Sequence, residues 1–464
     1  MNTSVDPCHD FYGYVCGRWL DLSLQHNWIE ERKNRLLLSL PNLINKRQRK
    51  SAPSTIRMAQ VLYSSCLAVE DQYKLGLQPL FDLLNKLNLP RVPAMIEPEQ
   101  SSSDQGEDNF VKSMARVRKL LGIDAFFILD VKRDSRDKRK NLLRFAPPNT
   151  DTLTKVDRFY MLNVFQRIIN NRTSESCDEF DIVPSENITN LVNQIRNLSL
   201  VVDELNQKYA NKYSLIDQAK EIDDAKYMLL DELQQATDHY VRSVNESIVP
   251  RPLWRPLIEE LLLEVVDFDP AQQKVYVGDL EYLQEIAYLL SSTEEQLLET
   301  TVWWMVVNFC VPHTSKELRD ISIKRGKNLP RSTYCSNSLN DLMSMAVAWI
   351  VVEPTFARDD SRDRVAEMLD NLKRAFANFV LEDDDRLDEP AKLATLEKIR
   401  RLKSIIGFPD SLFQDGQLDK YYDGINLTTN HYFNNLLQII RSENNKKLLN
   451  LAKYNADDDD DFSE

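Results

Sequence analysis

The stretch Val5-Asp-Pro-Cys-His-Asp-Phe-Tyr-Gly-Tyr-Val-Cys-Gly-Arg-Trp-Leu20 says most about the fold of this chain. Its pattern, P-C-x-D-F-Y-x-Y-x-C-G-x-W, combines two cysteines with four aromatic side chains in a short span. An aspartate, Asp10, stands directly before the first aromatic pair, where it is predicted to cap the start of a helix. His9 beside it is predicted to be a surface residue.

Outward from this motif, apolar residues recur mostly at helical spacing. Only 10 of the 464 residues are glycine, which disfavours the many tight turns of a barrel or sandwich. We predict a mainly α fold, a large multi-helix lobe. The helices are expected at residues 29–45, 54–72, 190–211, 216–245, 252–265, 279–291, 294–311, 338–352, 360–380, 390–405 and 430–450.

Two short segments, 125–131 and 142–145, alternate like strands around a charged turn and predict one small β-hairpin. Trp303 and Trp304 lie in a strongly apolar helix and are predicted to be core. A stripe at helical spacing is predicted to be core as well; it consists of Leu369, Leu372, Phe376 and Phe379. The folded domain is placed at residues 1–456, followed by a disordered acidic tail at 457–464.

The N-terminal motif resembles that of the neprilysin-type zinc metallopeptidases, the family of neprilysin and endothelin-converting enzyme. Further segments resemble this family in the same order along the chain: Met58–Cys66, Val275–Ile286, Thr301–Trp304, Cys335–Phe356, Ala391–Asp410 and Tyr421–Asn435. Two turns depart from the family pattern, at residues 146–150 and 382–388. Such departures suit a divergent member of the family.

The family cleaves peptides with a zinc ion held by an H-E-x-x-H helix, in which the glutamate acts as general base. The histidines of this chain are His9, His26, His239, His313 and His431. No two of them are four residues apart, and none is followed by glutamate. We therefore expect no catalytic residue, no metal ligand and no cofactor in this chain, since the family's zinc belongs to a lobe that is absent here. No substrate-binding residue is carried over.

The resemblance also implies a disulfide between Cys66 and Cys335. It would close a loop of about 270 residues and stabilise the fold by about 4–5 kcal/mol in the chain-entropy model. Cys8 and Cys16 pair in the family with cysteines of the catalytic lobe, so here they are left without these partners. They could instead pair with each other. Cys177 and Cys310 either form a bridge or stay reduced.

Composition limits the classes of partner. The net charge of −14 argues against nucleic acid, and the basic run Lys132–Lys140 is predicted to be solvated surface. No apolar segment reaches the about 20 residues that span a bilayer, and no signal peptide is recognisable. The cysteines and the family resemblance nevertheless favour an extracellular, secreted or cell-surface location. Candidate glycosylation sites are Asn171, Asn187, Asn197, Asn245 and Asn426.

Three readings of the function stay open. The first is a neprilysin-like lobe that has lost, or is separated from, its catalytic partner and is inactive alone. The second is a fragment of an active zinc endopeptidase, and the third is a secreted helical scaffold. Expected partners are peptides, a separate catalytic lobe of this type, or a second copy of the chain. Exposed aromatic residues of the N-terminal motif (Phe11, Tyr12, Tyr14 and Trp19) would favour such association.

Overall fold

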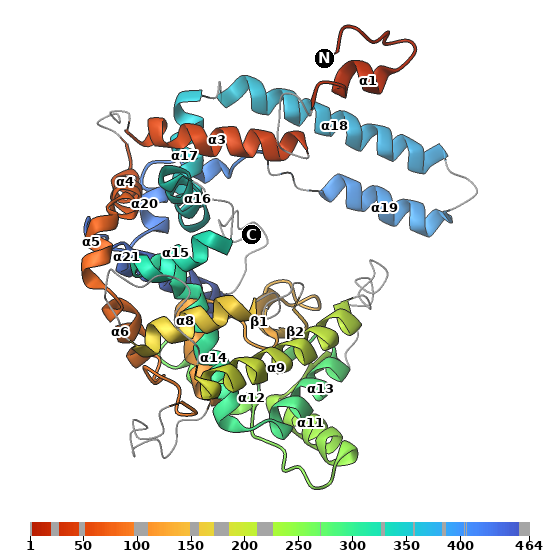
Figure 1. The fold of residues 1–464 in the computed structure, drawn as a ribbon. Helices are drawn as coiled ribbons and strands as arrows, with labels where there is room; N and C mark the ends of the chain where they lie inside the picture. Colours follow the sequence, from red (N-terminus) through yellow and green to blue (C-terminus); the bar gives the residue numbers. More distant parts are fainter. Residues whose placement is uncertain are drawn as a thin grey trace. The chain divides into compact units, whose positions relative to one another are not determined.

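The computed structural model describes residues 2–19, 27–45, 52–96, 110–148, 157–170, 185–210, 226–269, 271–325, 330–355, 358–382, 387–402, 404 and 406–453. Helices dominate these residues, and the strands form one small sheet, so the predicted mainly α fold is confirmed (Figure 1). The chain divides into two compact units. Unit 1 comprises Met1–Leu67 and Leu329–Asp423, and unit 2 comprises Ala68–Asn328 and Gly424–Glu464.

Unit 1 is built from helices of two distant parts of the chain. They are α1 (Phe11–Cys16), α3 (Trp28–Asn45), α4 (Ser54–Leu67), α16 (Arg331–Leu342), α17 (Ser344–Thr355), α18 (Arg358–Glu382), α19 (Glu389–Arg401), the 3-10 helix η4 (Asp410–Phe413) and α20 (Gln417–Tyr421). Helices α3 and α4 pack against α16 and α17, and α18 packs along α19. The single helix predicted at 338–352 is wrong, because Met343 leaves the helical conformation (φ −133°, ψ 52°) and separates α16 from α17.

Unit 2 holds the larger set of helices. They are α5 (Val69–Leu75), α6 (Gln78–Lys86), α7 (Phe110–Leu121), α8 (Arg158–Asn170), α9 (Glu186–Ala210), α11 (Leu230–Val244), α12 (Trp254–Leu262), α13 (Leu280–Ser292), α14 (Glu295–Cys310), η3 (Val311–His313), α15 (Lys316–Arg325), α21 (Tyr432–Leu449) and η5 (Asn450–Ala452). The helix predicted at 54–72 is in fact α4 and α5, which Ala68 separates with non-helical angles (φ −76°, ψ 68°).

The centre of unit 2 is α14, which is apolar on all sides and therefore has to be covered by other helices. Trp303 and Trp304 are buried in it, as predicted. Phe165 of α8 stacks on Trp304 at 5.5 Å between ring centroids and lies 5.0 Å from Trp303. The indole nitrogen of Trp303 donates a hydrogen bond of 2.9 Å to the carbonyl oxygen of Pro90, so its polar group is satisfied inside the core.

The predicted hairpin is present as β1 (Ile128–Arg133) and β2 (Asn141–Ala146), with Ile128 opposite Ala146 and Arg133 opposite Asn141. Two further strands, which the sequence did not indicate, extend it to a sheet of order β1-β2-β4-β3. Strand β4 (Val275–Val277) is parallel to β2, and β3 (Tyr227–Met228) is antiparallel to β4. The helix predicted at 216–245 is therefore wrong at residues 227–228, because this segment pairs with β4.

The outer edge of β1 is capped by side chains at Leu129, which is buried. Arg118 donates from Nε to the carbonyl oxygen of Leu129 at 3.1 Å, and Asp124 accepts from the amide of Leu129 at 3.3 Å. Arg118 and Asp124 are themselves an ion pair at 2.6 Å. Unpaired strand groups at an edge attract other strands, so this pair blocks strand addition at that position of β1.

Candidate functional site

The N-terminal motif forms α1, and Asp10 caps it as predicted, since its carboxylate accepts a hydrogen bond of 2.8 Å from the amide of Gly13. No residue of α1 is buried. Phe11 and Tyr12 expose 68% and 77% of their surface, and Tyr14 and Trp19 are half-buried. The motif thus presents an aromatic surface to solvent, which proteins seldom do without a partner.

A disulfide joins α4 to α16 inside unit 1. It links Cys66 to Cys335, whose Cα atoms are 5.8 Å apart although 269 positions separate them in sequence. This is the pair that the family resemblance implies. Arg331, in the first turn of α16, donates two hydrogen bonds of 2.9 and 2.6 Å to the carbonyl oxygen of Cys66. The end of α4 is therefore held to the start of α16 by a covalent bond and by a charged donor.

The other described cysteines, Cys8, Cys16 and Cys310, form no disulfide in this structure. Cys8 is exposed and Cys16 half-buried, and the two do not pair with each other. Cys310 is fully buried in α14, where burial raises the pKa of its thiol, so this thiol is an inert part of the core. Cys177 lies outside the described residues.

Helix α18 carries a stripe whose predicted burial is wrong. Leu372, Phe376 and Phe379 expose 64%, 52% and 56% of their surface, and Leu369 is half-buried. Val365 and Met368, one turn earlier on the same stripe, are exposed as well. The spacing indicated an apolar face correctly, but this face is turned to solvent. Sequence inspection missed Val365 and Met368, although they continue the three-and-four repeat.

Zinc catalysis would need a set of three protein ligands. Within the described ranges, no group of three or more His, Cys, Asp or Glu side chains is placed to hold a metal ion. His313 and His431 line one small cavity together with Tyr432 and Gln72, whereas His9 and His239 are exposed at other places in the chain. His26 lies outside the described residues. The described residues therefore do not fit a catalytic zinc ion.

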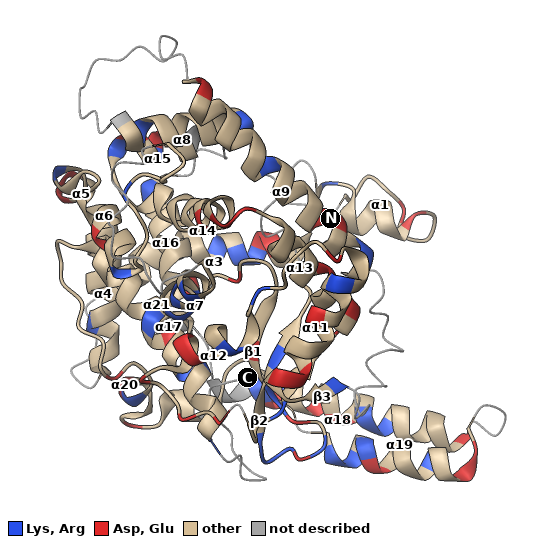
Figure 2. Ribbon diagram, turned by 90° about the horizontal axis from the view of Figure 1, so that it is seen from below, with Lys and Arg blue, Asp and Glu red and all other residues tan. Residues whose placement is uncertain are grey.

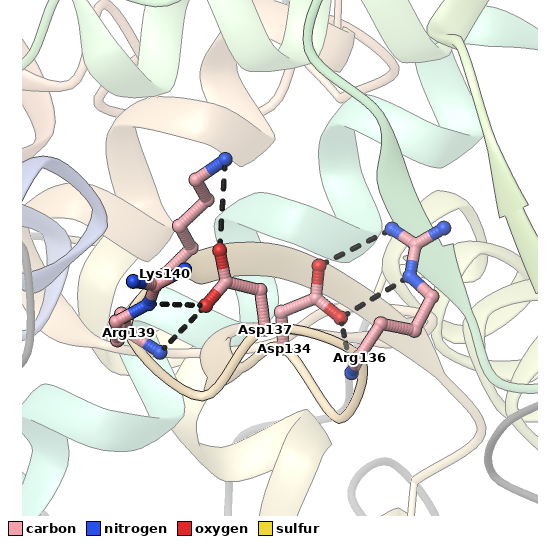
Figure 3. A network of polar contacts seen from close by, with 5 residues as sticks. All are labelled: Asp134, Arg136, Asp137, Arg139 and Lys140. Atoms are coloured by element: carbon pink, nitrogen blue, oxygen red, sulfur yellow. Dashed lines mark hydrogen bonds and ion pairs between the residues drawn. The ribbon is translucent and has the colours of Figure 1, made fainter. Parts of the chain in front are cut away.

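Two carboxylates of the basic run at the β1–β2 turn, Asp134 and Asp137, pair with three of its six basic side chains (Figure 3). Asp134 accepts from the backbone amide and the guanidinium of Arg136 at 2.9 and 3.2 Å. Asp137 pairs with Arg139 at 3.0 Å and with Lys140 at 3.7 Å. The hydrogen bond from Arg139 lowers the pKa of Asp137, which keeps this carboxylate ionised. Arg133, Lys138, Arg139 and Lys140 are exposed, so this run is solvated surface, as predicted.

A depression in unit 2 has a volume of about 660 Å³ and lies beside the loop Ser247–Pro252. Arg251 at its rim donates to Glu295 at 2.9 Å and to the carbonyl oxygen of Thr293 at 2.9 Å. The charged residues that line this depression, Arg251 and Glu295, thus pair with each other.

The glycosylation candidates Asn187, Asn197, Asn245 and Asn426 all have exposed side chains. Asn171 lies outside the described residues. Asn245 follows the last turn of α11, and its side-chain oxygen accepts a hydrogen bond of 3.0 Å from the amide of Ser247 in the same sequon. The sequon of Asn197 lies within α9, and its Ser199 hydroxyl is buried and donates to the carbonyl oxygen of Ile195 at 2.8 Å.

Comparison with known proteins identifies the family. The model of the N-terminal domain of peptidase family M13 matches residues 7–409, and the chain belongs to this family. It is 26% identical to Neprilysin-11 of Caenorhabditis elegans over 92% of this chain and 50% of that protein. It is 22% identical to human endothelin-converting enzyme 1, over 94% of this chain and 55% of the enzyme. The chain thus spans about half the length of these relatives.

Solved structures agree with the fold. Zinc metalloprotease Zmp1 of Mycobacterium tuberculosis, in complex with an inhibitor, superimposes with a TM-score of 0.68 at 17% identity. The match covers 99% of this chain and 65% of that one. PepO of Lactobacillus rhamnosis gives a TM-score of 0.62 at 14% identity and covers 96% of this chain and 66% of PepO. At such identities the likeness concerns the fold alone.

Proposed function

We propose that this chain acts as the non-catalytic lobe of a neprilysin-type metallopeptidase and cleaves no peptide by itself. The observation that carries the proposal is the coverage: 92% of this chain matches only 50% of Neprilysin-11. The sequence over this region has no H-E-x-x-H helix. In the proposed role the chain covers a separate zinc-peptidase lobe and limits which peptides reach it. The proposed role is the same whether the peptidase lobe belongs to the same polypeptide or to a separate one.

The chemistry of the described residues supports a covering role. Hydrolysis of a peptide bond needs a general base, usually a carboxylate or an imidazole, within reach of the attacking water. It also needs a group that polarises the peptide carbonyl. The histidines that line a cavity, His313 and His431, share it with apolar and amide side chains, without a described carboxylate. The zinc of the family would supply the activated water, and this chain's own residues would shape access to it.

We further propose an extracellular location with N-linked glycans on the exposed sequons. The long-range disulfide between Cys66 and Cys335 supports an oxidising compartment, where such bonds persist. No helix within the described ranges has the length and apolar character needed to cross a membrane. Treatment of secreted chain with a glycosidase specific for N-linked glycans should reduce its mass, and unchanged mass would contradict the glycan proposal.

The test of the main proposal is a metal and activity assay on the purified chain. We expect less than stoichiometric zinc by elemental analysis and no peptide cleavage that a chelator suppresses. Intact Neprilysin-11, assayed in parallel on the same peptides, is the reference for detection. One tightly held zinc ion per chain together with chelator-sensitive cleavage would refute the proposed role.

A further inference from the structure

We propose that the turn between β1 and β2 is a processing site, cut after Arg139 by a serine endoprotease of the secretory pathway that recognises basic residues. This inference goes beyond the covering role, and its setting rests on the extracellular location proposed above. The turn contains Arg136-Asp-Lys-Arg139, followed by Lys140. Basic side chains therefore stand at the first, second and fourth positions before the bond to be cut.

The spacing of these basic residues suits a protease that binds its substrate in an extended conformation. Side chains of an extended chain alternate between two sides, so a bound turn would direct Arg136 and Lys138 to one side and Arg139 to the other. An acidic pocket gives trypsin its preference for a basic residue before the cut. The chemistry that recognises all three side chains is therefore a cleft lined by several carboxylates, as in a protease specific for Arg-x-Lys-Arg.

The turn presents its basic residues to solvent. Arg136, Lys138, Arg139 and Lys140 are exposed, and they lie between the end of β1 and the start of β2, outside helix and strand. Arg136 lies over the ring of Tyr227, 3.4 Å from its centre, a contact that it has to leave when a protease binds. Exposed loop tips are the places where folded proteins are preferentially cut.

The other paired basic residues of the described ranges lie inside regular structure. They belong to α3, α7, α15, α18, α19 and α21, or to β1. Lys373–Arg374 and Arg400–Arg401, for example, stand in α18 and α19, on which acidic residues are interspersed with the basic ones (Figure 2). A protease that needs an extended substrate would have to unwind such a helix, whereas at the turn it has to open only a short loop. The conformation of the chain thus selects the β1–β2 turn.

Ion pairs within the turn are too weak to protect it. Asp137 holds Arg139 at 3.0 Å and Lys140 at 3.7 Å (Figure 3). The side chains of these two basic residues are nevertheless 54% and 66% exposed. Ion pairs this exposed contribute little, because water screens the charges. An acidic protease cleft can therefore displace Asp137 from Arg139.

The cut leaves the protein assembled. Hydrolysis adds one water molecule across the bond after Arg139, which leaves a carboxylate on Arg139 and an ammonium group on Lys140. Six residue pairs still hold β1 to β2 on the two sides of the cut. Cys66 lies before the cut and Cys335 after it, so their disulfide joins the two pieces covalently. We expect a two-chain protein whose pieces separate only after denaturation and reduction.

The test is treatment of the purified chain with a proprotein convertase, a subtilisin-type endoprotease that cuts after Arg-x-Lys-Arg. Denaturing gels should show the pieces 1–139 and 140–464 with reductant and one band without it. Arg139→Ala should be cut at least about tenfold more slowly, because the acidic pocket loses its arginine. Lys140→Ala removes the neighbouring charge but keeps Arg-x-Lys-Arg, so this matched control should be cut at least as fast as wild type. Mass spectrometry should place the new carboxyl terminus at Arg139.

Expression behind a signal peptide in secretory cells shows whether the site is used. We expect secreted wild type and Lys140→Ala to carry the cut and Arg139→Ala to stay intact, with unchanged helical circular dichroism. Equal cutting of Arg139→Ala and wild type would refute the site. Wild type that leaves the cells uncut would overturn the proposal, even if added convertase cuts it. The zinc and activity assay does not depend on the cut, so the covering role is tested separately.

Discussion

Asp419 caps the start of a helix that lies 364 residues away in sequence. Its carboxylate accepts a hydrogen bond of 2.8 Å from the backbone amide of Thr55 and one of 2.7 Å from the Thr55 hydroxyl. The amide of Ser54 donates to the same carboxylate at 3.1 Å. The first amides of α4, which no residue of the helix itself can satisfy, are therefore satisfied by α20. This contact and the disulfide hold together the two chain segments that build unit 1.

Removal of this cap should destabilise unit 1. We expect Asp419→Ala to lower the free energy of unfolding by about 1–2 kcal/mol, because the helix start loses both its acceptor and a favourable charge at its positive end. Chemical denaturation followed by circular dichroism measures the effect. Asp415→Ala, an exposed aspartate four residues earlier, is the control and should change stability by less than about 0.5 kcal/mol. Equal effects of the two substitutions would contradict the capping role.

The contribution of the Asp419 cap to the free energy of unfolding should depend on pH in the acidic range. Burial raises the pKa of Asp419, but the hydrogen bonds from Thr55 and Ser54 outweigh it and leave the pKa below its ordinary value. Because the pKa is lower in the folded state, the ionised carboxylate stabilises the fold at pH values above the unfolded-state pKa of about 4. This stabilisation is lost as the pH falls through the folded-state pKa. The stability difference between wild type and Asp419→Asn should be constant near pH 6–7 and shrink below about pH 4. A constant difference down to pH 3 would refute this.

Loss of the disulfide should affect unit 1 strongly. The double variant Cys66→Ala/Cys335→Ala frees a loop of 269 positions. The chain-entropy model gives about 5–6 kcal/mol for a loop of this length, above the about 4–5 kcal/mol expected from the sequence, and we expect a loss of about 5 kcal/mol. Thermal unfolding of the oxidised protein gives the measurement. Cys8→Ala, which removes an exposed cysteine outside any disulfide, is the matched control and should leave the unfolding temperature unchanged. Peptide mapping without reductant should recover the Cys66–Cys335 pair from wild type.

A buried hydroxyl in unit 2 offers a test of core hydrogen bonding. The Tyr282 hydroxyl lies 2.5 Å from the carbonyl oxygen of Phe126 and 2.8 Å from the side-chain oxygen of Asn206. Burial raises the pKa of Tyr282, so its hydroxyl stays protonated and can donate. We expect Tyr282→Phe to cost about 1–2 kcal/mol, because the hydroxyl has one proton and its removal leaves a buried acceptor without a donor. Tyr288→Phe on the same helix should be nearly neutral, and a neutral Tyr282→Phe would show that water replaces the hydroxyl.

Local patterns in the sequence were sufficient for several features. The scarcity of glycine and the helical spacing of apolar residues predicted a mainly α fold. Asp10 was identifiable as a cap because the residue that it serves, Gly13, is three positions away. The two buried tryptophans of α14 were predictable because that helix is apolar on every side. Each of these features is decided by residues within one or two helical turns.

Other features depend on partners that sequence spacing does not identify. The sequence alone determined that α18 has an apolar face, that the chain is helical and that it lacks the H-E-x-x-H helix. Only the tertiary structure decided that Leu372 and Phe376 face solvent, that β3 and β4 join the hairpin, and that Asp419 caps α4. The physical reason is that the spacing of apolar residues in the sequence indicates only which side of a helix or strand is apolar. What covers that side, or satisfies the end of a helix, is set by contacts between segments hundreds of residues apart.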